Sequence, residues 1–186
     1  MKYLAPAAAL ILAGCGVAPE HYAGEQPPLK LEEYLNGTLI AVGTVQDYRG
    51  AVTRRMCVEL NGSWVDGVGT LDEQFYFDDG ERQQRIWTIK PSRDGYIGSA
   101  ADIKGEAAGG VGGFAMNWRY GMDLLVDGSS YAVTFDDWLF QLDERYLLNR
   151  AAIRKFGLTV AEVTLMFDKG TARCPESWRQ RAVKSG

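Results

Sequence analysis

Histidine is nearly absent from the sequence, since the only one is His21, in a Pro-rich stretch near the N-terminus. The rest of the chain offers no imidazole for Ser-His-Asp or Cys-His catalysis, or for the common His-containing zinc sites. We therefore expect no metal and no organic cofactor, and we expect His21 to be a solvated linker residue. An excess of positive charge is also missing, because 20 Lys and Arg stand against 24 Asp and Glu. Nucleic-acid binders are normally basic, so we expect no nucleic-acid partner.

The sequence also lacks an apolar run of the roughly 20 residues that a transmembrane helix needs. The apolar stretch from Tyr3 to Ala13 is shorter, follows the basic Lys2 and precedes a small residue and Cys15. These features are typical of a secretion signal. The "LAGC" of residues 12–15 resembles a bacterial lipobox, in which the cysteine is acylated and becomes the first residue after cleavage. The alternative is an ordinary signal peptide that contains Cys15 by chance.

A lipidated N-terminus would determine where the protein resides. Two or three acyl chains, at about 0.8 kcal/mol per buried methylene, hold a soluble domain on a membrane. Gly16, rather than Asp, after the cysteine favours the outer membrane by the usual sorting rule for such lipoproteins. We therefore expect an outer-membrane lipoprotein that contacts the membrane through acylated Cys15 and whose domain lies in the periplasm. The sequence names no protein partner.

The chain divides into four expected segments. Residues 1–14 form the signal peptide, and residues 15–28 form the lipidated Cys with a polar, Pro-rich tether. Residues 29–168 form one domain, because no other linker appears and a chain of this length can bury a sizeable core. Residues 169–186 are expected to form a basic tail, which either meets anionic headgroups or is simply a solvated chain end.

Cysteine is scarce, because only Cys57 and Cys174 are present besides Cys15. In an oxidising periplasm two remaining cysteines suggest one disulfide. The period-two alternation of residues 52–60 places Cys57 on the outward face of a strand. A bridge to Cys174 would then fasten the tail to the outside of the domain. Two free buried thiols are the alternative.

From Leu39 onward, stretches of alternating polarity are separated by turns that contain Gly, Asp and Asn. Helices are indicated only at residues 29–37 and after Pro175. The predicted strands are residues 38–48, 52–60, 69–77, 84–90, 95–103, 114–124, 130–142, 145–155 and 158–167. Strands without a long crossover favour an all-β antiparallel meander, and closing it removes the exposed edges. We predict a lipocalin-like up-and-down barrel with a short helix covering one end, and a β-sandwich is the alternative.

The same alternation predicts what lies inside the barrel. The predicted inward faces are aromatic, with a few charges that need partners of opposite sign. A barrel of about eight to ten strands leaves room for a small ligand. The predicted ligand-binding or interior polar network consists of Asp137, Asn149, Arg150, Lys155, Glu162, Arg85, Glu73, Arg54, Trp87, Trp118 and Tyr120.

Neighbouring acids and the Gly-rich stretch carry little evidence of catalysis. Asp136 and Asp137 are adjacent along a strand, so they point to opposite faces and make a poor catalytic pair. Asp143 and Glu144 are expected to form a turn between two strands. The Gly-rich residues 105–114 lack the Lys-Ser/Thr of a phosphate loop, and no helix follows them. We expect a flexible hairpin connection there and assign no catalytic residue.

Three stretches, "GTLIAVGTVQDYRG", "IWTI" and above all "DDWLFQLDERYLLNRAAIRKFGLTVAEVTLMF", carry a resemblance that covers residues 29–168. They resemble an uncharacterised family of proposed Gram-negative outer-membrane lipoproteins, catalogued as a domain of unknown function. The matching positions are Gly37, Ala41, Gly43, Asp47, Trp87, Trp118, Tyr120, Asp127, Gly128, Asp136, Asp137, Trp138, Asn149, Arg150, Lys155, Phe156, Gly157, Glu162 and Thr164. Val42 and the tail after Asp168 depart from the pattern. The resemblance implies a lipid-anchored, lipocalin-like domain without established activity, associated with genes for fatty-acid modification.

Three functions compete. The favoured one is a binding module whose barrel holds a hydrophobic or amphipathic ligand, such as a fatty acid, with Arg85, Arg150 or Lys155 facing its headgroup. The first alternative is an envelope structural or assembly lipoprotein that acts through an exposed apolar patch or an open sheet edge. The second is a histidine-free enzyme of lipid modification that uses Asp137 or Glu162 beside Arg150 and Lys155. Enzymatic activity is left open, with a non-catalytic role favoured.

Overall fold

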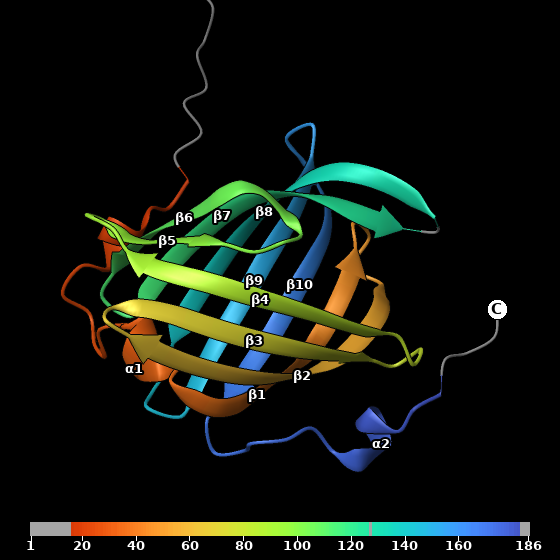
Figure 1. The fold of residues 1–186 in the computed structure, drawn as a ribbon. Coiled ribbons are helices and arrows are strands. Elements are labelled where there is room, and N and C mark those ends of the chain that lie inside the picture. The colour runs from red at the N-terminus through yellow and green to blue at the C-terminus, as the bar shows by residue number, and fades with distance from the viewer. Residues whose placement is uncertain (1–15, 127, 183–186) are drawn as a thin grey trace, which may run out of the picture.

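The structure is a computed structural model that describes residues 16–126 and 128–182, so Cys15 and the predicted signal peptide lie outside the described residues. Its strands are antiparallel and close into one barrel in the order β1-β10-β9-β8-β7-β6-β5-β4-β3-β2 (Figure 1). The strands are β1 (Gly37–Asp47), β2 (Val52–Val65), β3 (Val68–Phe77), β4 (Arg82–Pro91), β5 (Gly95–Ser99), β6 (Ile103–Gly112), β7 (Ala115–Val126), β8 (Ser129–Gln141), β9 (Tyr146–Lys155) and β10 (Leu158–Asp168). The predicted up-and-down barrel is confirmed, and because the sheet closes on itself the sandwich alternative is wrong.

The Gly-rich residues 105–114 are not a flexible connection, and this prediction is wrong. They lie mainly in β6, which pairs with both β5 and β7. Two of their glycines allow close packing: a Cβ at Gly109 would lie 2.4 Å from Met116 Cε, and one at Gly112 would lie 1.8 Å from the Pro19 carbonyl oxygen. The predicted strand 95–103 is accordingly divided between β5 and β6, which gives one strand more than expected.

One end of the barrel is covered by α1 (Leu31–Tyr34), and we call it the closed end (Figure 1). The turns after β2, β4, β6 and β8 lie at this end. Leu31 and Tyr34 are buried in the core, and the Leu31 N–H donates to the Tyr96 hydroxyl over 3.1 Å. The Tyr34 hydroxyl donates to the Arg145 carbonyl over 2.8 Å. The helix is shorter than the predicted residues 29–37, but it covers one end as expected.

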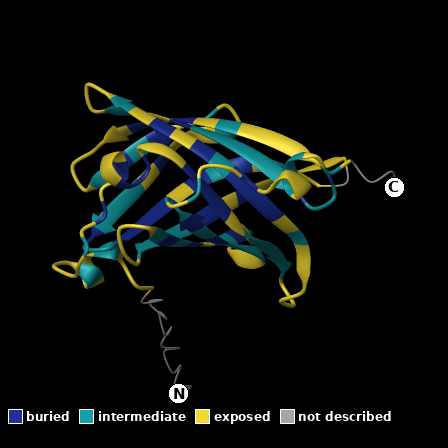
Figure 2. Ribbon diagram, turned by 90° about the horizontal axis from the view of Figure 1, so that it is seen from below, coloured by how far each residue is buried: buried dark blue, intermediate teal, exposed yellow. Residues whose placement is uncertain are grey.

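Large aliphatic side chains fill the closed half of the barrel. Leu39 and Leu147 are 0% exposed, and Leu60 is 2% exposed. Figure 2 shows that buried segments alternate with exposed ones along the strands, as the period of two requires. The opposite end holds the turns after β1, β3, β5, β7 and β9, and no helix among the described residues covers it. We call it the open end.

The N-terminal segment packs against the outside of the barrel rather than extending freely as a tether. Its 3-10 helix η1 (Pro19–Tyr22) contacts β6 and β7. The Tyr22 ring lies 5.1 Å from Phe114, and 6.1 and 6.0 Å from Trp138 and Phe140, all edge to face. His21 is exposed, as expected. In the described part of the chain, no helix has the length and apolar character that crossing a bilayer would require.

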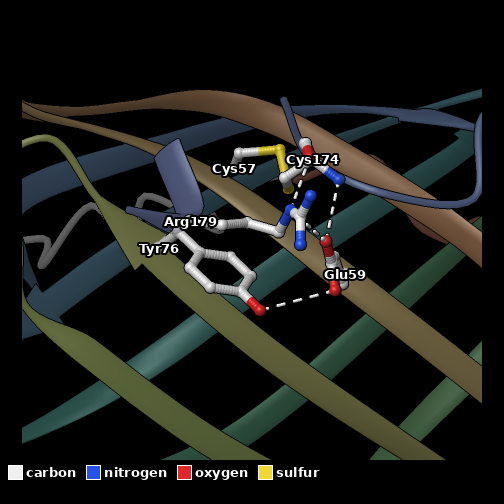
Figure 3. Close-up of a disulfide and its surroundings, with 5 residues drawn as sticks. All are labelled: Cys57, Glu59, Tyr76, Cys174 and Arg179. Carbon is white, nitrogen blue, oxygen red and sulfur yellow. Dashed lines mark hydrogen bonds and ion pairs between the residues drawn. A yellow bond between two sulfur atoms is a disulfide. The ribbon is translucent and has the colours of Figure 1, made fainter. Parts of the chain in front are cut away.

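Cys57 and Cys174 form a disulfide, so the bridge is the alternative that the structure contains (Figure 3). Cys57 points out of the barrel and is nevertheless 0% exposed, because the tail covers it. The Cys174 N–H donates to Glu59 Oε1 over 2.9 Å, and the Tyr76 hydroxyl donates to Glu59 Oε2 over 3.4 Å. Beyond Cys174, α2 (Glu176–Arg179) lies against β3. The described part of the tail is thus fastened to the outer wall as far as Arg181, whose Nη1 donates to the Asp78 carbonyl.

Candidate functional site

Polar side chains gather on the inner wall of the barrel, above the packed closed half. The pairing of β3 with β4 sets Glu73 opposite Arg85, and the pairing of β7 with β8 sets Trp118 opposite Asp137. Glu73, Arg85 and Asp137 point inward but keep partial solvent exposure. We call Glu73, Arg85, Trp87, Tyr120 and Asp137 the mid-barrel cluster. It brings together five of the residues that the sequence predicted for the interior network.

Arg85 is the cation of the mid-barrel cluster. Its Nη2 lies 2.8 Å from Asp102 Oδ2, and its Nε donates to both Asp102 oxygens over 3.1 and 2.9 Å. The guanidinium also lies 5.8 Å from the Phe75 ring and 5.7 Å from the Trp87 ring. The sequence prediction did not include Asp102, which comes from the connection between β5 and β6. A fork-shaped pair of this kind holds Arg85 in one orientation.

The two carboxylates of the cluster accept few hydrogen bonds. Glu73 Oε2 accepts one from Trp87 Nε1 over 3.1 Å. Asp137 Oδ2 accepts one from the Tyr120 hydroxyl over 3.3 Å, and Asp137 Oδ1 is buried without a partner in the described structure. The Trp87 ring meets the rings of Trp118 and Tyr120 edge to face at 5.8 and 5.3 Å. The polar groups of the cluster are thus set against packed aromatic rings.

The surroundings shift the proton affinities of these groups. Burial raises the pKa of Asp137 to about 7, although the hydrogen bond from Tyr120 and the charge of Arg85 oppose the rise. Burial also raises the pKa of Glu73 to about 7, against the effects of Arg85 and Trp87. The pKa of Tyr120 lies well above its ordinary value because of burial and the nearby Asp137. Two carboxyl groups that change charge near neutral pH inside a barrel make this a candidate functional site.

Arg54 lies closer to the open end and has its own partners. Its Nη2 lies 2.9 Å from Asp79 Oδ2 and 2.8 Å from Glu81 Oε2, both near the β3–β4 turn. Its guanidinium lies 3.6 Å from the Phe77 ring centroid, and its Nε is buried without a hydrogen bond in the described structure. Arg54 therefore belongs to the wall of the open half but is already neutralised.

The structure corrects the prediction for Arg150 and Glu162. Both lie on the outer face, where Arg150 Nη2 is 3.3 Å from Glu162 Oε2. The reason is the period of two: Asn149 points inward and is 6% exposed, so its neighbour Arg150 must point outward. Asn149 donates to the Trp138 carbonyl over 3.2 Å. Asp137 and Arg150 therefore cannot act together in one active site, because the sheet separates these two groups.

The positions of Asp136 and Lys155 also follow from the strands that carry them. Asp136 lies on the outer face and is 6% exposed, held by Arg119, Arg154 and Asn117 at 3.1, 3.1 and 2.7 Å. Lys155 lies at the rim of the open end, with its Nζ 4.3 Å from the Tyr131 ring centroid. The predicted separation of the adjacent acids at 136 and 137 is confirmed, and only Asp137 reaches the interior.

Other features of the described residues do not compete with the mid-barrel cluster. One cleft of about 460 Å³ lies near the turn after β9, with Lys104, Arg154 and Phe156 among its lining residues. Another of about 390 Å³ lies by the turn after β4. Neither includes a residue of the cluster. In the described parts of the chain, no group of three or more His, Cys, Asp or Glu is arranged to hold a metal ion.

These observations define the class of protein: an all-β, closed antiparallel barrel with a polar cluster set among aromatic rings in its interior. The chain belongs to the family described as "Protein of unknown function (DUF3833)", whose model matches residues 9–169. A comparison with curated proteins finds no match. The family covers the whole barrel and supplies no activity to transfer to the cluster.

Proposed function

We propose that this protein is a lipid-anchored envelope lipoprotein whose barrel binds a hydrophobic or amphipathic small molecule through the open end. The observation that carries the proposal is the contrast inside the barrel. The inward side chains of the closed half are buried, whereas the mid-barrel cluster lies among aromatic and aliphatic side chains that keep partial exposure, Val45, Phe75 and Val163 among them. Ligand sites in proteins are mostly apolar with a few convergent polar groups.

The energetics of the cluster support a binding role. An unpaired buried acceptor such as Asp137 Oδ1 costs about 1 to 3 kcal/mol, and a ligand that satisfies it recovers that energy. Aromatic walls add area to be removed from water on binding, at about 25 cal/mol per Å². A purely structural barrel gains stability by replacing such a cluster with aliphatic side chains. The cluster therefore makes physical sense as a site that is completed by a ligand.

The test uses tryptophan fluorescence with a brominated alkyl amphiphile, because bromine quenches an indole that it contacts. The full chain carries Cys15→Ser, so that no attached acyl chain competes. We expect saturable quenching that is markedly reduced in Trp87→Phe, since this ring lies in the cluster. Trp178→Phe is the matched control, because this ring lies in the tail outside the barrel. Equal loss in both variants, or no saturable quenching, would contradict binding inside the barrel.

The membrane anchor is a separate part of the proposal and is supported by the sequence at Cys15. We propose that acylation of this cysteine holds the protein on the periplasmic side of the outer membrane. Metabolic labelling with an alkynyl fatty acid tests it: the wild-type chain takes up the label and sediments with outer membranes. Cys15→Ala is expected to lose both properties. A labelled Cys15→Ala chain, or an unlabelled wild-type chain, would contradict the proposal.

A second candidate function is that of an envelope structural or assembly lipoprotein that acts through the outer surface of the rim. The exposed side chain of Phe156 favours it. This side chain is 95% exposed at the turn after β9, and Leu158 beside it is 73% exposed. Phe156 also has a φ of 52°, a left-handed conformation that is unusual for a bulky residue. An open sheet edge is not the contact, because both edges are paired in the barrel. A photo-crosslinker at position 156 tests it in cells, with position 66 at the closed end as control.

A further inference from the structure

The carboxylate oxygens of the mid-barrel cluster receive few hydrogen bonds. Glu73 and Asp137 offer two carboxylates, and in the described structure each accepts one hydrogen bond, from Trp87 and Tyr120 respectively. Asp137 Oδ1, buried without a partner, adds an acceptor that no described group satisfies. A ligand that completes this set must therefore bring a hydrogen-bond donor, because a further acceptor would leave Asp137 Oδ1 unpaired.

The charges point the same way. Arg85 is engaged by Asp102 on two of its nitrogens, so the ionised cluster with Asp102 holds three negative charges against one positive charge. Arg54, which also points into the barrel, is paired with two acids of its own. The sequence predicted that Arg85, Arg150 or Lys155 would face an acidic headgroup. Arg85 is neutralised by Asp102, Arg150 lies outside the barrel, and Lys155 lies at the rim over the Tyr131 ring.

We propose that the mid-barrel cluster selects an amphiphile whose buried end is a cationic hydrogen-bond donor, an ammonium group, rather than a carboxylate. This inference rests on the proposed ligand-binding function and narrows its ligand class. The ammonium lies between the carboxylates of Glu73 and Asp137. Its alkyl chain runs toward the open end along the apolar wall formed by Val45 and Val163, which pair directly across β1 and β10.

The opposite orientation would place an anionic headgroup at the rim, beside Lys155. Lys155 already lies over the Tyr131 ring, and a chain that descended from there would end with its methyl group against the carboxylates of the cluster. Burying apolar carbon against unpaired carboxylates leaves their desolvation uncompensated. The orientation with the headgroup in the cluster avoids this cost.

The pH dependence follows from the groups that face the site. Around Asp137 these are Tyr120, Arg85, Glu73 and, through the sheet, Asp136. Asp102, which pairs with Arg85 on the neighbouring strand, and Asp72 act on Glu73. The two carboxyl groups lose their protons near pH 7, whereas an alkylammonium stays charged well above that pH, as lysine does. Affinity for the amine is therefore expected to rise about tenfold between pH 6 and pH 8.

The experiment compares three probes with the same chain, dodecylamine, dodecanoate and dodecanol, below their micelle concentrations. Calorimetry with the full chain carrying Cys15→Ser is expected to rank the amine tightest at pH 8, by about tenfold or more over the carboxylate. Asp137→Asn is expected to remove most of that preference, and Glu73→Gln is a second variant in case the first folds poorly. Glu144→Gln removes the same unit of charge from an exposed turn and is expected to change nothing.

The possible outcomes separate this inference from the proposed function. If dodecanoate binds as tightly as dodecylamine, or Asp137→Asn leaves the ratio unchanged, the ammonium inference is overturned while ligand binding stands. If Lys155→Gln weakens dodecanoate and Asp137→Asn does not affect any probe, the headgroup lies at the rim and the inference is wrong. If none of the three probes binds, the proposed ligand-binding function itself is overturned.

Discussion

The two halves of the barrel differ in what fills their interiors. In the closed half, inward side chains such as Leu39 and Leu147 are fully buried, and α1 seals the end. Above it, the inner wall carries two carboxyl groups, Glu73 and Asp137, whose burial raises their pKa to about 7. Nearer the rim, Arg54 forms an ion pair with Asp79. The first arrangement maximises stability, whereas the second gives up stability for polar groups held in an apolar wall. The most deeply buried side chains and the candidate site therefore lie at different heights of the same strands.

The open half is stabilised from outside, by the tail. The Cys57–Cys174 disulfide closes a loop with a sequence separation of 117, and Arg181 Nη1 donates to the Asp78 carbonyl over 2.9 Å. Replacing both cysteines by alanine is expected to lower the free energy of unfolding by about 4 kcal/mol, because long closed loops gain the most from a crosslink. Urea unfolding measures it, with the reduced wild-type chain as control. An unchanged unfolding midpoint would show that the tail does not brace the barrel.

Truncating one leucine in each half tests the contrast inside the barrel. Leu147→Ala removes a fully buried side chain and is expected to cost about 3 to 4 kcal/mol, including the cavity that it leaves. Leu124→Ala, on an inward position of β7 near the open end, removes a partly exposed side chain and is expected to cost about 1 kcal/mol. Thermal and urea unfolding measure both variants. Equal losses would mean that the open half is packed as tightly as the closed half.

The acids of the two halves are expected to respond to pH with opposite sign. The folded-state pKa of Asp137 lies near 7 and thus above its unfolded value of about 4, so its contribution to stability is present below pH 4 and is lost as the pH rises through 7. Asp137→Asn is therefore expected to stabilise the protein at pH 8, by at most about 4 kcal/mol for a shift of this size, and to leave it unchanged at pH 4. Unfolding curves at both pH values measure this. A destabilised variant at pH 8 would contradict the desolvation argument.

Asp168, at the closed end, provides the matched control. Arg145 and nearby N–H groups hold its pKa far below the ordinary value, so its stabilisation is present above about pH 4 and is lost on acidification. Arg145 Nε lies 2.6 Å from Asp168 Oδ1. Asp168→Asn is expected to destabilise the protein at neutral pH and to have little effect in acid. The two Asp→Asn variants thus change stability in opposite directions within one fold.

Local alternation was enough to predict much of this architecture. It predicted the barrel, the outward direction of Cys57, and the separation of Asp136 from Asp137, because each depends only on the period of a strand. It failed in β6, where glycines are used for close packing against Pro19 and Met116 rather than for flexibility. Such packing depends on segments distant in the sequence, which alternation does not reveal.

The candidate site was predicted in part, for a related reason. Glu73, Arg85 and Asp137 were assigned correctly to the interior, but Arg150 was included although its neighbour Asn149 already occupies the inward position. The partner of Arg85 was missed altogether, because Asp102 comes from a connection whose position is set by the pairing of β4, β5 and β6. Side-chain partners across a barrel follow from strand register, and register is a tertiary property.

Two turns at opposite ends of the barrel share one backbone conformation but differ in sequence. Asp66-Gly67 at the closed end and Phe156-Gly157 at the open end both have positive φ at both residues, 50° and 78° against 52° and 80°. Asp or Asn followed by Gly suits this turn, whereas Phe is strained there. Phe156→Asn is therefore expected to stabilise the barrel by about 1 kcal/mol, and Asp66→Asn to change it by less than about 0.5 kcal/mol. Thermal unfolding measures both. A gain at position 156 alone means that the open end keeps a strained, exposed aromatic ring for a reason other than folding, and an unchanged stability means that the turn accommodates Phe156 without strain.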